Sequence, residues 1–161
     1  MESDYELIMS KQEVHYEDIT KLLKQRTEKY KEKSFIEKYA LYMGMVQILE
    51  LQVKQILLSK FGFETEKQFE KLEKMTFGQA VKCLKNNHVR PDIIHLLEHN
   101  RDNRNDMAHS FLSQTVISTS LGFSLESIEV RQLDKYIHEL ENVILFWEWC
   151  LHNDALLPHD A

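Results

Sequence analysis

The chain has 161 residues, of which 43% are hydrophobic, and its 26 acidic and 20 basic side chains give a formal net charge of −6 with histidine neutral. This length supports one domain and is too short to expect two, so we predict a single domain over residues 1–161 with its core at about 35–150. The acidic balance argues against a broad, non-specific grip on nucleic acid, because that grip requires many lysines and arginines at phosphates. Any contact with nucleic acid is therefore expected to be local.

Glycine and proline are scarce, with four and two residues, while leucine, glutamate, lysine and glutamine are plentiful. This composition favours helices. We expect an all-α fold, an antiparallel helical bundle with two long helices plus shorter ones. Cys83 and Cys150 have no C-x-x-C spacing, which is typical of reduced, mostly buried thiols. No apolar run reaches the roughly 20 residues that span a bilayer, and the N-terminus is acidic, so we expect a cytoplasmic protein without membrane contact.

Capping signals divide the first half of the chain. A weakly apolar helix is expected before residue 34, with a buried stripe of Ile19, Leu22, Leu23 and Tyr30. Three pairs have the spacing of a capping box and predict helix starts: Ser34 with Glu37, Thr65 with Gln68, and Thr76 with Gln79. They predict a long helix from Ser34 to about Phe61, ending near Gly62, and short helices at about 66–74 and 77–87.

The second half is less regular. Pro91 suits the first turn of a helix, and the asparagines and aspartate at 100, 102 and 103 predict a break or a new helix start. The stretch "LSQTVISTSLGFS", residues 112–124, contains β-branched residues and a glycine, and we expect a loop or short extended piece there. A strict three-four alternation of apolar residues predicts a helix over about 128–152. The tail "NDALLPHDA" is expected to fray.

One candidate for chemistry is "HLLEH", residues 95–99. His95 and His99 lie one turn apart on a helix, and Glu98 completes the H-x-x-E-H order of inverted zinc proteases. No third ligand is marked elsewhere, so a solvated helix face is the favoured interpretation. An unbroken helix would extend this face to Asp102, Asp106 and His109, but it would also place Arg104 in an apolar stripe, which is costly without a partner.

A second candidate is "RNDMAH", residues 104–109. Asn105 and His109 are spaced i and i+4 and share a helix face, which the long Arg104 side chain can reach. This set suits phosphodiester chemistry, because arginine binds phosphate oxygens bidentately and histidine transfers protons near neutral pH. The alternative is a group of polar surface residues after a helix cap.

The Arg104-Asn105-x-x-x-His109 pattern resembles the signature of the HEPN family, small helical bundles in which arginine and a polar residue precede a histidine. The long helix from Ser34, the "MTFGQAV" helix start, the helix leading into the motif and the aromatic-rich C-terminal helix resemble the family's order of parts over residues 35–150. The resemblance implies a metal-independent endoribonuclease without a cofactor, a hydrolase-type enzyme that often acts as a toxin or in defence against phage.

The implied reaction is attack of the RNA 2′-hydroxyl on the adjacent phosphate, which leaves a 2′,3′-cyclic phosphate and a 5′-hydroxyl. Arg104 would stabilise charge on phosphorus, His109 would act as general acid or base, and Asn105 would orient one of them. Related toxins paired with a nucleotidyltransferase antitoxin often carry a modified tyrosine two residues after the histidine. Phe111 stands there, which argues against that control.

The motif supplies one histidine per chain, whereas the cleavage benefits from both an acid and a base. We therefore expect a homodimer in which Arg104 and His109 of both chains line one groove at the two-fold axis. Arg101, Asp102 and Asp106 are candidates for supporting the site or contacting RNA, and an antitoxin or the product of a neighbouring gene is a possible partner. Two alternatives stay open: an inactive HEPN-like module that binds RNA, a nucleotide or a protein, and a metalloenzyme on His95 and His99, with His109 as a candidate third ligand.

Overall fold

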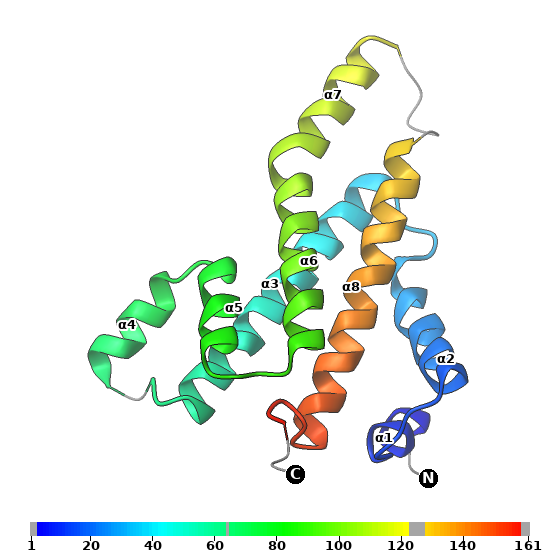
Figure 1. Ribbon diagram of the computed structural model, residues 1–161. Helices are drawn as coiled ribbons and strands as arrows, with labels where there is room; N and C mark the ends of the chain where they lie inside the picture. Colours follow the sequence, from blue (N-terminus) through cyan, green and yellow to red (C-terminus); the bar gives the residue numbers. More distant parts are fainter. Residues whose placement is uncertain (1–2, 64, 123–127, 159–161) are drawn as a thin grey trace.

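The computed structural model describes the backbone at residues 3–63, 65–122 and 128–158, and the side chains at these positions except 110–112, 115, 118, 128 and 129. All regular structure in this part of the chain is helical, which confirms the all-α fold class. The two longest helices are α3 (Phe35–Lys60) and α8 (Ile128–His152), as predicted. Figure 1 shows α8 antiparallel to α6 (Pro91–Asp106), with α3 crossing behind both.

The predicted capping boxes start three helices. Ser34 accepts from the backbone amide of Glu37, whose carboxylate accepts from the Ser34 amide at 2.7 Å, and this pairing opens α3. The same arrangement opens α4 (Glu66–Lys74) and α5 (Phe77–Asn86). Gly62 follows α3 with a φ of 78°, a left-handed conformation that glycine adopts without steric cost. A further capping box opens α1 (Asp4–Met9), a helix that the sequence analysis did not predict.

The core lies where α3, α5, α6 and α8 meet. Helix α3 contributes residues at three- and four-residue spacing, each at most 1% exposed: Tyr42, Val46, Leu49, Val53 and Leu57. Trp147 of α8 is fully buried among them. Helix α2 (Tyr16–Thr27) packs on the other side of α8 through Leu22 and Leu23, two residues of the predicted stripe. Burying each such side chain stabilises the fold by about 1.5–3 kcal/mol.

The predicted break near residues 100–103 is wrong, since α6 continues to Asp106. Asn100 and Asn103 are both buried inside the bundle. The Asn100 amide donates to the carbonyl of Leu96 at 3.0 Å, and the Asn103 amide donates to the Glu139 carboxylate of α8 at 2.7 Å. Asn103 thus has a tertiary partner, and the Asn100 amide returns to a carbonyl one turn back on its own helix, so neither side chain ends α6.

The loop or extended piece predicted from residue 112 is also wrong, because residues Leu112–Ser120 form helix α7. A π-helical turn, η2 (Met107–Phe111), joins α6 to α7, and Figure 1 shows α7 continuing from α6 beyond the rest of the bundle. Extending an existing helix avoids the cost of nucleation, which is larger than the small penalties of β-branched residues. The part of the prediction at residues 123–124 lies outside the described residues.

The start of the C-terminal tail is packed rather than frayed. Leu156 is 2% exposed, and its carbonyl accepts from the Arg90 amide at 2.9 Å. This bond holds the tail against the start of α6, and that of the Ala155 amide to the Cys150 carbonyl at 2.8 Å holds it against the end of α8. Both cysteines are free, with Cys150 buried and Cys83 partly exposed. No helix within the described ranges is long and apolar enough to cross a membrane.

Candidate functional site at the end of helix α6

The Arg104, Asn105 and His109 motif lies where α6 passes into the π-helical turn. Pro91 opens α6, and Ile93, Ile94 and Leu97 anchor its first half in the core. Its second half turns Asn100 and Asn103 inward, and Met107 at the start of the π turn is buried as well. The motif is thus carried by a helix that is fixed at its base, and the π turn that is described between α6 and α7 holds His109, just after Arg104 and Asn105.

Two motif side chains face solvent. Asn105 and His109 are both exposed, whereas Met107, midway between them, is fully buried. One turn of a π-helix takes slightly more than four residues, so side chains four positions apart lie on nearly the same face. The inward direction of Met107 therefore sends Asn105 and His109 outward together.

Arg104 is half-buried and is not stranded in an apolar stripe, contrary to the expectation for an unbroken helix. Its Nη1 donates to Oδ1 of Asn105 at 3.1 Å, so the guanidinium and the amide of the motif are in direct contact. The inward face of α6 becomes polar at this level, since Asn100 and Asn103 replace aliphatic residues. A long arginine side chain can lie along such a face with its head at the surface.

Two tyrosines hold the turn from neighbouring helices. The Tyr39 hydroxyl of α3 donates to the Met107 carbonyl at 3.1 Å, and the Tyr136 hydroxyl of α8 donates to the Asp106 carboxylate at 3.0 Å. The Met107 carbonyl, at the start of the π turn, is thereby tied to α3. Asp106, a predicted supporting residue, therefore supports the turn through Tyr136.

Glu139 of α8 joins several polar side chains of α6. Its Oε2 accepts from Asn103 and lies 3.1 Å from Nε2 of His99, while Lys135 lies 3.8 Å from Oε1. His99, a predicted metal ligand in the alternative hypothesis, thus contacts a carboxylate of another helix. Among the described residues, no three histidine, cysteine, aspartate or glutamate side chains are grouped so as to hold a metal ion.

The remaining predicted residues separate into two directions. Nη2 of Arg101 lies 2.7 Å from Oδ1 of Asp102, so these two neighbours pair with each other. The Arg101 side chain crosses Gly78 of α5, where a Cβ would stand 3.1 Å from its Cδ. Arg101 is therefore turned toward α5, and Asp106 toward α8. His95 is exposed on α6 one turn before His99.

The interior beneath the motif favours neutral tyrosines. Burial raises the pKa of Tyr42 far above its ordinary value, the charges of Glu139 and Asp106 raise it further, and Arg104 lowers it. Burial likewise raises the pKa of Tyr136, and its bond to Asp106 acts in the same direction. The fully buried Tyr42 hydroxyl has no hydrogen-bond partner among the described residues. The positive charge of Arg104 therefore acts on the Tyr42 hydroxyl in the direction opposite to the two carboxylates.

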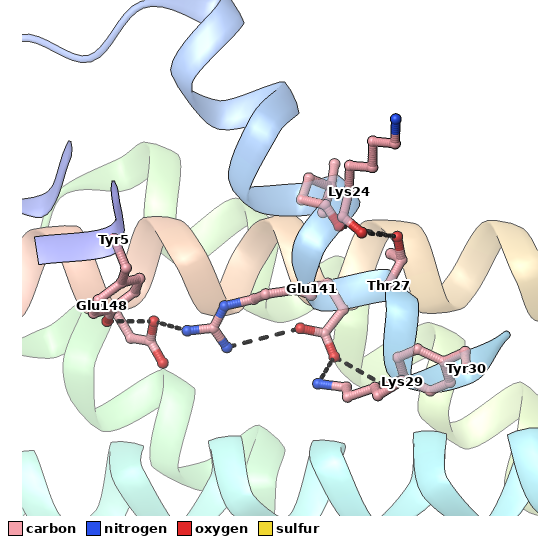
Figure 2. A network of polar contacts seen from close by, with 9 residues as sticks. Tyr5, Lys24, Thr27, Lys29, Tyr30, Glu141 and Glu148 are labelled. Carbon is pink, nitrogen blue, oxygen red and sulfur yellow. Dashed lines mark hydrogen bonds and ion pairs between the residues drawn. The ribbon is translucent and has the colours of Figure 1, made fainter. Parts of the chain in front are cut away.

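A second polar cluster, drawn in Figure 2, fastens α2 and the residues directly after it to α8. The carboxylate of Glu141 is fully buried, and its Oε1 accepts from the Tyr30 hydroxyl at 2.9 Å and from Lys29 at 2.5 Å. Arg26 lies 3.8 Å from Oε2 of Glu141 and also pairs with Glu148. Burial and the Glu141 charge raise the pKa of Tyr30 well above its usual range.

A cavity of about 820 Å³ lies at the opposite end of α6, near Arg90 and Trp149. The Arg90 guanidinium stacks over Trp149 at 5.9 Å and is held by the Asp92 carboxylate at 2.7 Å. Arg90 precedes Arg104 by fourteen positions, which corresponds to about 21 Å along a helix. The cavity and the motif are therefore separate features.

Tyr39 and Tyr136 contact the turn that carries the motif, and Glu139 bonds Asn103 one position before it; none of the three was predicted from the sequence. Tyr39 and Tyr136 fall on helices whose periodicity was recognised, but periodicity does not reveal which hydroxyl meets which partner across the bundle. No known protein-family model, no curated protein and no solved structure shows significant similarity to this chain. The chemistry of the site must therefore be judged from its own residues.

Proposed function

We propose that this protein is a metal-independent endoribonuclease of HEPN type that cleaves RNA through Arg104, Asn105 and His109. The observation that supports the proposal most strongly is that these residues share the end of α6 and the turn after it, where Asn105 and His109 are exposed and the Arg104 guanidinium is bonded to Asn105. A guanidinium and an exposed imidazole on the same end of a helix suit a phosphodiester, because the guanidinium can bind the phosphate and the imidazole can move a proton.

In the proposed reaction, a base removes the proton of the RNA 2′-hydroxyl, and this oxygen attacks the adjacent phosphorus. The bond from phosphorus to the 5′-oxygen breaks, and an acid supplies a proton to the leaving oxygen. The products are a 2′,3′-cyclic phosphate and a 5′-hydroxyl. His109 carries one or both protons, and Arg104 stabilises the additional negative charge on the phosphate oxygens in the transition state.

Asn105 acts as a positioning residue. Its Oδ1 accepts from one guanidinium nitrogen, which leaves the other donors of Arg104 available for phosphate oxygens. The fixed neighbour reduces the rotamer freedom that an exposed arginine would lose on binding. Asn105→Ala is therefore expected to weaken catalysis less than loss of Arg104 itself.

The proposal includes a homodimer, in which the second chain supplies the second histidine. Apolar side chains on α7 and in the turn after it, beyond the motif, support self-association: Val116 is 57% and Ile117 59% exposed on the helix, and Leu121 69% in the turn. Figure 1 shows that α7 projects past the bundle, where another chain can cover it. Light scattering at micromolar concentration should give twice the monomer mass, and a monomer would contradict this part of the proposal.

The proposed biological role is that of a toxin or an anti-phage component in the cytoplasm, controlled by an antitoxin or another protein encoded nearby. Position 111 is phenylalanine, which has no hydroxyl to modify. Control by nucleotidylation two residues after the histidine is therefore not part of the proposal. The Phe111 side chain lies outside the described residues.

The test is cleavage of RNA in EDTA by the purified protein, compared with His109→Ala and Arg104→Ala. His95→Ala is the matched control, because His95 is an exposed histidine on the same helix. Loss of cleavage in the first two variants and retention in the third would support the proposal. Equal cleavage by all variants would contradict it, and RNA binding without cleavage by the wild type would favour an inactive RNA-binding module.

A further inference from the structure

A groove between α4 and α5 gathers positive charge on an otherwise acidic protein. It has a volume of about 430 Å³ and is lined by Lys71, Lys74, Met75, Gln79, Lys82, Cys83 and Asn86, and we call it the lysine groove. Its described lining holds three lysines and no carboxylate. Since the whole chain carries a net charge of −6, the groove is a local exception.

Helix α4 sorts its charges by face. Glu66, Glu70 and Glu73 repeat at four and three residues, and the lysines at 67, 71 and 74 repeat one position later. At about 100° per residue, the lysine row lies on the face adjacent to the glutamate row. The lysines at 71 and 74 line the groove, so the basic face is the one turned toward α5.

Helix α5 completes the groove with donors. Gln79, Lys82, Cys83 and Asn86 follow the spacing of one helix face and all line the groove. The Oε1 atom of Gln79 is occupied by the backbone amide of Thr76 at 2.8 Å, so its amide nitrogen is the group left for a ligand. Ammonium and amide donors together are suited to phosphate oxygens.

Arg101 connects the lysine groove to the motif. Gly78 has no side chain, and the Arg101 side chain lies across it, within 3.1 Å of where a Cβ would be. Lys82 follows Gly78 by one turn of α5 and therefore lies on the same side. Arg104 and Asn105 follow Arg101 by about one turn of α6. Viewed down the helix axis, Arg104 is rotated about 60° to one side of Arg101 and Asn105 about 40° to the other. Basic side chains thus follow one another from Lys82 through Arg101 to Arg104, with the Arg101 guanidinium shared with the Asp102 carboxylate.

We propose that the lysine groove binds the phosphate backbone of single-stranded RNA and that Arg101 guides this strand to Arg104 and His109. The inference rests on the proposed ribonuclease function for its substrate, but the groove is assigned from its own charge and geometry. A flexible single strand can follow a path from α4 across α5 to the end of α6. A rigid duplex could contact this acidic protein only over short stretches.

The first experiment measures binding of a fluorescent single-stranded RNA oligonucleotide by anisotropy in EDTA. All proteins carry His109→Ala, so that cleavage does not interfere. The test variant adds K71E, K74E and K82E, and the control adds K24E, K31E and K33E, three exposed lysines near α2 with the same change in charge. We expect the dissociation constant to rise at least tenfold in the test variant and to change less than threefold in the control.

The salt dependence of the same binding reports on the phosphate contacts. Each lost contact reduces the slope of log K against log salt by about 0.7 for single strands, so loss of three lysines should reduce it by about 2. Circular dichroism establishes that the variants are folded. If the glutamate variant unfolds, K71Q, K74Q and K82Q remove the charges without repulsion, and the same direction of change is expected.

Cys83 provides a direct footprint of the groove. Its thiol lines the groove and is partly exposed, whereas Cys150 is buried and burial raises its pKa to about 11. Alkylation by iodoacetamide, followed by mass spectrometry, should therefore label Cys83 first. Bound RNA should slow the labelling of Cys83 at least fivefold and leave Cys150 unchanged. Unaltered labelling of Cys83 at saturating RNA would overturn the proposal.

The outcomes separate the groove from the catalytic proposal. RNA binding that depends on the groove lysines, without cleavage by the wild type, would support the groove and overturn the ribonuclease. Cleavage and RNA binding that are indifferent to K71E, K74E and K82E would overturn the groove alone. Equally tight binding of a poly-glutamate peptide in place of RNA would show a protein-binding surface instead and would also overturn the RNA assignment.

Discussion

Replacing Glu141 by leucine should destabilise the protein mainly through the hydroxyl that it leaves behind. Tyr30 is 4% exposed and donates to Glu141 at 2.9 Å, so its hydroxyl would become a buried donor without a partner, at a cost of about 1–3 kcal/mol. The Lys29 side chain is 34% exposed and can return to water, so losing that ion pair adds at most about 1 kcal/mol. Arg26 keeps Glu148 as its partner.

Two terms partly offset this cost, because leucine adds apolar burial and the carboxylate no longer has to be desolvated. We therefore expect Glu141→Leu to lower the free energy of unfolding by about 1–3 kcal/mol. In a protein that already carries Tyr30→Phe, no hydroxyl is stranded. The same Glu141→Leu change should then cost at least about 1 kcal/mol less, so the two substitutions should be strongly non-additive.

Urea unfolding, followed by tryptophan fluorescence, measures the four proteins of this cycle. A similar slope of the free energy of unfolding against urea concentration in all four proteins would show that the same surface is exposed on unfolding. Glu28→Leu is the control, because Glu28 is 61% exposed in its pair with Lys31 and should shift stability by less than about 0.5 kcal/mol. Additive effects of Glu141→Leu and Tyr30→Phe would refute the reasoning and assign the cost to the charges of Lys29 and Arg26.

Three further predictions concern pH, the groove and the π turn. The pKa values of the buried Tyr30 and Tyr42 are higher in the folded than in the unfolded protein, so these tyrosines ionise first in the unfolded state. The free energy of unfolding should therefore be unaffected below pH 10 and fall above it, by up to about 1.4 kcal/mol per pH unit for each tyrosine. Urea unfolding at pH 8–11 measures this. Gly78→Ala should stabilise helix α5 by up to about 1 kcal/mol and displace the Arg101 side chain that lies across position 78. Thermal unfolding should then show an unchanged or higher Tm, while the affinity for RNA falls about threefold. A lower Tm with unchanged affinity would contradict this. Tyr39→Phe removes the donor to the Met107 carbonyl and should lower the free energy of unfolding by about 0.5–1.5 kcal/mol. It should also slow RNA cleavage. Unchanged cleavage would mean that the π turn keeps its geometry without this hydrogen bond.

The sequence was most informative where local chemistry decides the structure. Each predicted capping box forms, because a serine or threonine and a side chain three residues later meet whatever the rest of the chain does. The long helices α3 and α8 were likewise predictable from their apolar spacing. These features depend on neighbours within one turn, which a single sequence displays.

Local reasoning failed where distant partners decide. Asn103 was expected to end a helix, but the Glu139 carboxylate, 36 positions away in the chain, bonds its amide inside the bundle. Helix α7 was missed because its residues, taken alone, are weak helix formers, whereas α6 has already been nucleated before it. The motif was found from its spacing, but its contacts with Tyr39 and Tyr136 required the packed helices.

The central claim is that Arg104, Asn105 and His109 cleave RNA without a metal ion, and the structure of the product ends tests it most directly. RNA incubated with the wild type in EDTA should yield fragments that mass spectrometry identifies as ending in a 2′,3′-cyclic phosphate and beginning with a 5′-hydroxyl. His109→Ala should reduce this cleavage at least a hundredfold, a loss within the usual contribution of a general acid or base of about 10²–10⁴, while His95→Ala should retain it. Intact RNA with the wild type, or the same fragments from His109→Ala, would contradict the account.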